Sequence, residues 1–296
     1  MRPDNTVEMS NESCTRLLDE LFACVQNSIK SSSEKHVHDL RVAIRRFKQS
    51  LDTFKSCYPQ SVTKKIAKRL KKAMRLAGCV RNLDVAMKFA EKWRLTGEHR
   101  LEAERKKKAH KLTNTLAEWV EDGCVTMWRE ELKTYPPGVE KTPVQHHARG
   151  LLSAMAASFF SRGNEAAASG ATTSEMHGFR IAAKKFRYTM ELFASIYGPV
   201  LEERIEQVGK LQSALGNIND CATLRDILAG DSAAARLRKR ERRKIKLFRA
   251  QWKFEFSRAA ITHEWVGALE GLSVLKEPKP GPPHRPGRRQ RKAGGE

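Results

Sequence analysis

Apolar residues recur every three or four positions along nearly the whole chain, which is the spacing that places them on one face of an α-helix. The clearest example runs from His38 to Tyr58, and Pro59 ends it because proline lacks the backbone N–H that a continuing helix needs. Its apolar stripe consists of Leu40, Ile44, Phe47, Leu51 and Phe54. No segment shows the alternating pattern of a β-strand. The pattern therefore predicts an all-α protein.

The stretch "YPPG" at residues 135–138 interrupts this pattern near the middle of the chain. Helices are expected over 17–29, 38–58, 61–76, 82–95 and 98–132 before it, and over 144–160, 177–197, 199–215, 219–228 and 233–260 after it. Gly78 and Gly216 are expected to form turns, and Asp84 and Asp220 to cap the helices that follow them. We predict two tandem antiparallel helical bundles of about four helices each, with halves at about 10–135 and 142–272 in one domain over 1–275.

The second half of the chain repeats the first. With an offset of 139 positions, "HDLRVAIRRFKQSLDTFKSCY" aligns with "HGFRIAAKKFRYTMELFASIY". His38 then matches His177, and Arg41 matches Arg180. Gly78 matches Gly216 after a one-residue deletion. Such a duplication predicts two similar bundles related by a pseudo-twofold axis.

Cations outnumber acids strongly, with 56 Lys and Arg against 34 Asp and Glu and a net charge of +22. An excess of this size makes a chain self-repulsive unless anions neutralise it, which indicates a phosphate-rich partner. Residues 276–296, rich in Pro, Gly and cations, are predicted to form a disordered basic tail. The basic stretch at 236–249 and this tail are expected either to contact anions outside the main site or to bind a different partner.

In both copies of the repeat, cations follow one helical face beside the apolar stripe. Like charges four residues apart destabilise a helix by roughly a few tenths of a kcal/mol per pair, so bound anions are expected to offset this cost. If the halves meet about a twofold axis, the two faces would line a shared groove. The candidate anion-binding residues are His38, Arg41, Arg45, Arg46, Lys48, Lys64, Lys68, Lys72, Arg75, Arg81, His177, Arg180, Lys184, Lys185 and Arg187.

The two histidines are placed at the starts of their helices, where the helix dipole and the next arginine disfavour a charged imidazole. A neutral His38 or His177 would either hydrogen-bond a neighbouring helix end or contact phosphate directly. Both interpretations stay open.

The paired motif H-x-x-R-x-x-x-[RK]-[RK]-F-[KR], followed in each half by a glycine, resembles the CHAD family, the conserved histidine α-helical domain. The resemblance covers roughly residues 16–269 and is strongest at "VHDLRVAIRRFKQSLDTF", "GCVRNLDVAM", "EMHGFRIAAKKFRYTMELFASIYG" and "LGNINDCATL". It implies a helical domain of two similar bundles that binds inorganic polyphosphate in a basic cleft or pore. It also implies association with polyphosphate granules and no chemistry of its own.

An enzymatic function is the weaker alternative. "EAERK" at 102–106 fits the ExExK signature of tunnel phosphatases, but residues two apart on a helix diverge by about 200°, so Glu102 and Glu104 would not share a metal. The chain has no P-loop, HExxH or GxSxG motif. We therefore expect no catalytic residue, metal or cofactor, and hydrolysis of a bound polyphosphate or phosphate ester is not favoured.

Sequence-nonspecific RNA or DNA binding is the stronger alternative, because phosphate contacts alone would hold nucleic acid as well. Proteins that bind single strands usually add aromatic side chains on which bases stack. Here the aromatic residues of the repeat, Phe47, Phe54, Phe186 and Phe193, lie on the core stripes. This favours a ligand without bases, with nucleic acid as a candidate secondary partner.

The start of the chain has no signal-peptide pattern, and no apolar run approaches the roughly eighteen residues of a membrane span. A cytoplasmic protein that does not enter membranes is expected. The six cysteines are scattered without metal-ligand spacing and are expected to be reduced, small apolar residues.

Overall fold

The protein was analysed as a computed structural model that describes residues 3–95, 97–228 and 231–271. Within these ranges the regular elements are helices, apart from one isolated bridge between Asn5 and Pro143. The first half contains α1 (Thr6–Lys30), α2 (Glu34–Thr53), the 3-10 helix η1 (Lys55–Cys57), α3 (Gln60–Trp93), α4 (Glu98–Glu121) and α5 (Cys124–Glu131). The second contains α6 (Val144–Ala167), α7 (Thr173–Tyr197), α8 (Pro199–Ile227), α9 (Asp231–Glu255) and α10 (Ala259–Glu270).

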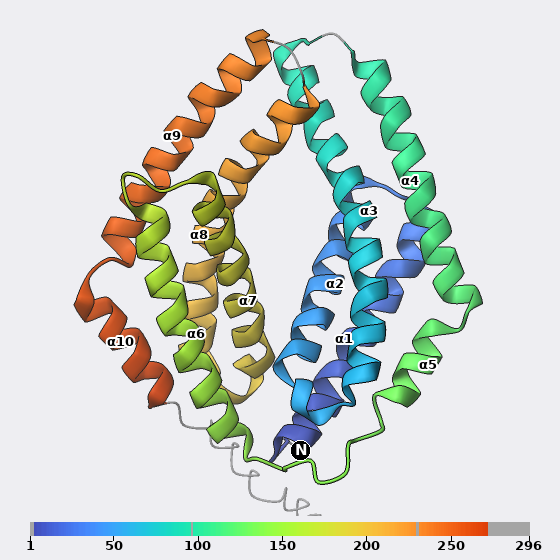
Figure 1. The fold of residues 1–296 in the computed structure, drawn as a ribbon, viewed down its shortest axis with the longest axis vertical. Coiled ribbons are helices and arrows are strands. Elements are labelled where there is room, and N and C mark those ends of the chain that lie inside the picture. The colour runs from blue at the N-terminus through green and yellow to red at the C-terminus, as the bar shows by residue number, and fades with distance from the viewer. Residues whose placement is uncertain (1–2, 96, 229–230, 272–296) are drawn as a thin grey trace, which may run out of the picture.

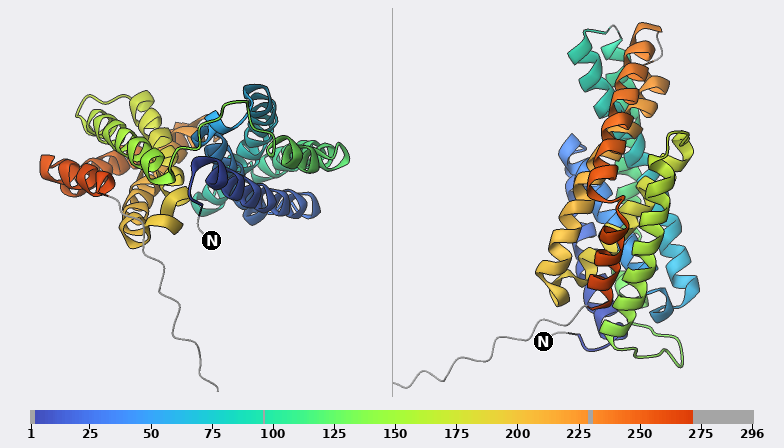
Figure 2. Two further views of the ribbon diagram at one scale, coloured as in Figure 1. Left: turned by 90° about the horizontal axis from the view of Figure 1, so that it is seen from below. Right: turned by 90° about the vertical axis from the view of Figure 1, so that its left-hand side faces the viewer.

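The two halves form two helical bundles that lie side by side, as Figure 1 and the left view of Figure 2 show. Consecutive long helices pack against each other in each bundle, and a short helix, α5 or α10, completes it. The α-helices follow the same order in both halves, which confirms the predicted all-α fold with internal pseudo-twofold symmetry. At the axis α2 packs against α7 and α3 packs against α8.

A continuous apolar core runs through both bundles and joins them at the axis. The rings of Phe54, just after α2, and Phe193 on α7 meet edge to face, with centroids 6.1 Å apart. Beside them the Gln49 side-chain amide donates to the Thr189 hydroxyl at 3.0 Å. A second, smaller apolar cluster joins the C-terminal parts of α3 and α8 to α4 and the first half of α9; its buried members are Leu83, Ala86, Ala90, Leu101, Cys221, Leu224 and Leu237.

The predicted turns at Gly78 and Gly216 are wrong. Both glycines lie inside single long helices, α3 and α8, and neither has a positive φ. Asp84 and Asp220 are consequently helix-interior residues rather than caps. Asp84 is buried and accepts from the Nε of Arg105 on α4 at 2.5 Å.

Three other predicted boundaries also differ. The helix expected over 98–132 divides at Gly123, whose φ of 60° is the left-handed conformation that glycine adopts without a Cβ clash. The helix expected over 233–260 divides between Glu255 and Ala259. Conversely, α6 continues to Ala167, beyond the expected end at residue 160.

The two helices of the repeat begin about one turn earlier than expected because side chains cap them. The Ser33 hydroxyl accepts from the His36 backbone N–H at 3.2 Å and starts α2. Thr172 and Glu175 form a reciprocal capping box that starts α7. His38 and His177 therefore lie in the second turn of their helices and not at the helix starts.

None of the helices in the described part of the chain is long and apolar enough to cross a membrane. The tail predicted to be disordered, at 276–296, lies outside the described residues.

Candidate anion-binding site

A cavity of about 400 Å³ lies between the two bundles and is called the inter-bundle cavity below. Side chains from α2 and α3 form one wall, and side chains from α7 and α8 form the other. Seven candidate residues line it: His38, Arg41, Arg45, Arg81, His177, Arg180 and Lys184. The cationic faces of the two repeat helices therefore converge at the axis of the molecule.

The inter-bundle cavity is strongly positive. Among the described residues that line it, Asp220 on α8 is the one carboxylate. Arg81 is partly compensated because it forms an ion pair with Glu34 at the start of α2. The other four cations, two from α2 and two from α7, form no ion pair with a carboxylate in the described ranges. Their mutual repulsion is therefore largely unrelieved.

Burial, and after it the charges of Arg180, Arg45 and Arg41, together lower the pKa of Lys184 from 10.5 to about 7, against the opposing effect of Asp220. Burial also lowers the pKa of Arg41 to about 10, with added repulsion from Arg45 and its neighbours. The pKa of Arg180 falls for the same first reason. The site thus holds cations that have lost water without gaining enough negative charge in return.

Donors of these cations are also left without strong acceptors. The Nε of Arg180 is buried and meets no hydrogen-bond acceptor among the described residues. Arg41 reaches only the backbone oxygen of Met74, at 3.5 Å. Its guanidinium lies over Gly78, where a Cβ would be 3.0 Å from Nη1, so the glycine leaves room for it. These free donors suit an anion with several oxygens.

A second hollow of about 260 Å³, called the side hollow, adjoins this cavity and shares Arg41, Arg45, Arg180 and Lys184 with it. Lys48 and Lys185 also line the side hollow. Lys48 is paired with Asp52 at 2.5 Å. The buried Tyr188 accepts from Arg45 Nε at 2.9 Å, which holds that arginine between the two hollows.

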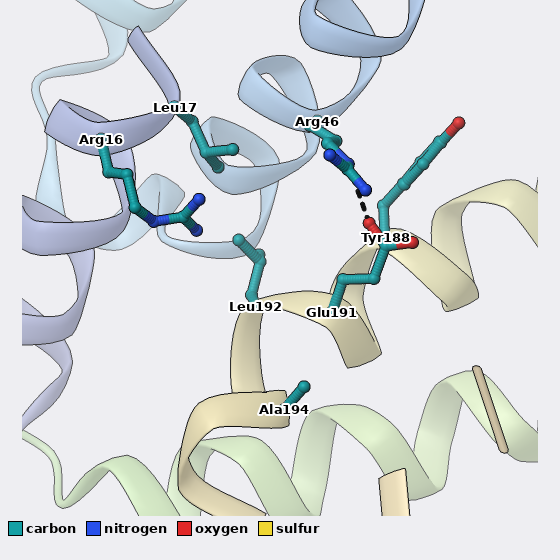
Figure 3. A pocket seen from close by; sticks show the side chains of 7 residues that line it. All are labelled: Arg16, Leu17, Arg46, Tyr188, Glu191, Leu192 and Ala194. Atoms are coloured by element: carbon teal, nitrogen blue, oxygen red, sulfur yellow. Dashed lines mark hydrogen bonds and ion pairs between the residues drawn. The ribbon is translucent and has the colours of Figure 1, made fainter. Parts of the chain in front are cut away.

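Arg46 and Arg187 do not line either hollow. Arg46 Nε binds Glu191 at 3.0 Å, and Arg187 Nη1 binds the other oxygen of the same carboxylate at 3.1 Å. Figure 3 shows Arg46 of α2 and Glu191 of α7 meeting across a small pocket of about 180 Å³ on the bundle interface. Both arginines therefore form ion pairs with the same carboxylate, which neutralises part of their charge.

Lys64, Lys68, Lys72 and Arg75 do not line the inter-bundle cavity either. All four are exposed on α3, and Lys72 pairs with Glu118 at 3.4 Å. By helical spacing, Lys64, Lys68 and Arg75 share the face of α3 that carries Gly78, but they precede it along the helix by about 5–21 Å. They extend the positive face of α3 away from the cavity.

The two histidines differ in their contacts. His177 Nδ1 lies 3.2 Å from the Asn219 side-chain oxygen on α8. His38 lines the cavity and is exposed, and its pKa is lowered by partial burial and by Arg81 and Arg45. These effects favour the neutral form of His38.

Sequence reasoning missed several residues of the cavity wall. Asp220, Asn219 and Asn82 lie in the interiors of α8 and α3, whereas they were expected at the starts of separate helices that follow turns. The offset that aligns Gly78 with Gly216 also aligns Asn82 with Asp220, and this pairing is the signal in the sequence that both residues face the axis. Gly78 and Gly216 were noticed as turns, but both lie inside continuous helices, and Gly78 leaves space there for the Arg41 guanidinium.

A family profile for the CHAD domain matches residues 13–229. The chain belongs to the CHAD family. Its fold is similar to the crystal structure of the CHAD domain from the plant Ricinus communis, with a TM-score of 0.66 and 17% identity over 93% of this chain and 96% of that one. It is also similar to PptA from Streptomyces chartreusis, with a TM-score of 0.56 and 12% identity over 84% of this chain and 98% of that one. No curated protein sequence matches the chain.

Proposed function

We propose that this CHAD protein binds inorganic polyphosphate in the inter-bundle cavity without chemically altering it. The observation that supports this most directly is the set of four unpaired, partly buried cations, Arg41, Arg45, Arg180 and Lys184, gathered at the axis around free donors. A phosphate chain offers dense negative charge and many acceptor oxygens, which would relieve the repulsion and satisfy the guanidinium groups together.

The lining of the cavity favours a ligand without bases. No Phe, Tyr or Trp ring lines the inter-bundle cavity in the described part of the chain. The rings of the repeat helices, Phe47, Phe54, Phe186 and Phe193, are each at most 1% exposed. A nucleotide placed in this cavity would gain phosphate contacts but no stacking, whereas polyphosphate needs none.

A polymer requires a path out of the cavity, and two cationic surfaces continue from it. The side hollow adds Lys48 and Lys185. On α3, Lys64, Lys68 and Arg75 extend along the face of Gly78. We therefore expect chains longer than the cavity itself to bind more tightly than short oligophosphates.

The test is a titration of a fluorescently labelled oligophosphate of about five phosphates, chosen so that contacts stay within the cavity. Arg41→Gln together with Arg180→Gln should lower affinity at least about 100-fold, because each removes charged hydrogen bonds. The matched control, Lys64→Gln with Lys68→Gln, removes the same charge from an exposed face and should leave affinity within about threefold. An equal loss of affinity in both double variants would show that binding depends only on net charge. It would refute the inter-bundle cavity as the binding site.

Binding without turnover predicts that long-chain polyphosphate incubated with the protein releases no orthophosphate. In cells, we propose that the same binding directs the protein to polyphosphate granules. A fluorescent fusion should therefore concentrate on granules, and the fusion carrying Arg41→Gln and Arg180→Gln should be dispersed. If the double variant still concentrated on granules, granule targeting would not depend on the inter-bundle cavity.

A further inference from the structure

The first half of α9 and the C-terminal end of α3 meet near the top of Figure 1 and enclose a hollow of about 550 Å³, called the outer groove. Trp93 of α3 and Leu247 of α9 line it together with cations. The cations are Arg236, Lys239, Arg240, Arg243 and Lys244, all from α9. No described residue lines both this groove and the inter-bundle cavity, and the smaller apolar cluster around Leu224 and Leu237 lies between them.

The outer groove contains no compensating acid among the described residues that line it. Within the basic stretch of α9 at 236–249 the one acidic residue is Glu241. Glu241 is buried on another side of the helix and is bound to Arg225 of α8 at 2.6 Å. The groove cations therefore face solvent as a continuous positive strip.

Aromatic rings lie beneath two of these cations. The Arg236 guanidinium sits 4.5 Å from the centre of the Trp93 ring, and Arg240 sits 5.2 Å from the centre of the Phe89 ring. Phe89 and Trp93 support each other edge to face at 5.1 Å. A guanidinium held over an indole provides a platform on which a nucleobase stacks, while neighbouring cations contact the phosphates of the strand.

Trp93 differs from the other tryptophans in its accessibility. The other four, Trp119, Trp128, Trp252 and Trp265, are each at most 2% exposed. Trp93 is only partly buried and opens into the groove. A partly exposed tryptophan under an arginine, in a strip without acids, has the composition of a single-strand binding surface.

We propose that the outer groove binds single-stranded nucleic acid through base stacking on the Arg236–Trp93 pair and phosphate contacts from the other α9 cations. This site is independent of the inter-bundle cavity and of the polyphosphate function proposed for it. Stacking uses the face of any base, so binding tolerates different sequences.

Two measurements test this proposal on the full chain with a labelled oligouridylate of about ten nucleotides. Binding should quench the fluorescence of Trp93, and Trp93→Leu should lower affinity about tenfold, with Trp93→Phe restoring most of it. Arg236→Gln with Arg243→Gln should lower affinity about tenfold or more. The matched control, Arg238→Gln with Arg242→Gln, removes the same charge from the opposite face of α9 and should change affinity less than about twofold.

The cavity variant Arg41→Gln with Arg180→Gln distinguishes the two sites, because it should retain oligouridylate binding. Loss of oligouridylate binding in that variant, with no effect of the groove substitutions, would overturn the proposal and place nucleic acid in the inter-bundle cavity. An unchanged affinity in Trp93→Leu, with polyphosphate displacing the oligonucleotide equally well per phosphate, would also overturn it. The groove would then recognise phosphate alone.

Discussion

Lys184 gives the inter-bundle cavity a pH-dependent charge, so polyphosphate binding should take up a proton near neutral pH. Its pKa of about 7 in the free protein follows from burial and from three arginines that face it. Only about one-tenth of this lysine is then protonated at pH 8. Phosphate oxygens in the cavity favour the charged form and return the pKa toward its usual value.

The magnitude follows from the two pKa values. With Lys184 at about 7 when free and near its ordinary value when bound, binding at pH 8 should take up about 0.9 proton. The sign is that acid favours binding: affinity is highest below pH 7 and falls as pH rises above it. Between pH 7 and pH 9 the loss should be about 50-fold.

Isothermal titration calorimetry in buffers of different ionisation enthalpy measures this proton uptake directly. Lys184→Arg is the matched control because arginine keeps its charge across this range. At pH 8, binding by Lys184→Arg should take up about one proton fewer than binding by the native protein. Protons exchanged by the polymer itself are the same in both titrations and cancel in the comparison. An affinity of the native protein that is constant between pH 7 and pH 9, with no proton uptake relative to Lys184→Arg, would refute the reasoning.

Glycine substitutions give two further predictions. Gly78→Ala and Gly216→Ala should each stabilise their helices by about 0.5–1 kcal/mol in thermal unfolding. Only Gly78→Ala should weaken oligophosphate binding, by a few-fold, because its methyl group would lie 3.0 Å from Arg41 Nη1. At Gly216 nothing lies within 4 Å of the added methyl group. Equal binding by both variants would contradict this prediction. Gly163→Ala should destabilise the fold by roughly 3 kcal/mol, because a Cβ at this position would lie 2.0 Å from the Trp252 ring. An unchanged melting temperature would contradict this, since it would mean that the Trp252 ring moves aside without cost.

The convergence of α2 and α7 could be anticipated because the repeat carries both the apolar stripe and the cations. Apolar spacing gives the buried face, and a duplicated helix with the same buried face meets its copy at a symmetry axis. Arg41 and Arg180, at equivalent positions, therefore both reach the inter-bundle cavity. Arg46 is the next residue after Arg45 and points about 100° away, which is why it binds Glu191 instead.

The continuity of α3 and α8 could not be read from composition. A glycine within an apolar pattern usually marks a helix end, since it costs about 1 kcal/mol inside a helix. Gly78 breaks this rule because the Arg41 guanidinium lies over it, a contact made by a different helix. Asp220 was misjudged for the same reason, because its position facing the axis depends on α8 being unbroken.

The outer groove shows a different limit. The basic stretch on α9 is plain in the sequence, but its stacking partner, Trp93, ends a helix of the other half. Only the tertiary fold brings the two together. The argument against nucleic acid was drawn from the repeat aromatics alone, so it concerns the inter-bundle cavity and does not extend to the outer groove.

Folding and binding depend on the charge of Lys184 in opposite ways. The unfolded chain holds this proton up to the ordinary lysine pKa of 10.5, whereas the folded protein releases it above about 7. Between these values the unfolded state binds more protons, so the contribution of Lys184 to the free energy of unfolding rises with pH, while phosphate affinity falls. Below pH 7 the folded protein holds a full set of repelling cations at its axis, opposed by contacts such as Phe54 with Phe193. If the proposed function is correct, bound polyphosphate would remove that repulsion and the associated pH dependence, and the anion would help to hold the two bundles together.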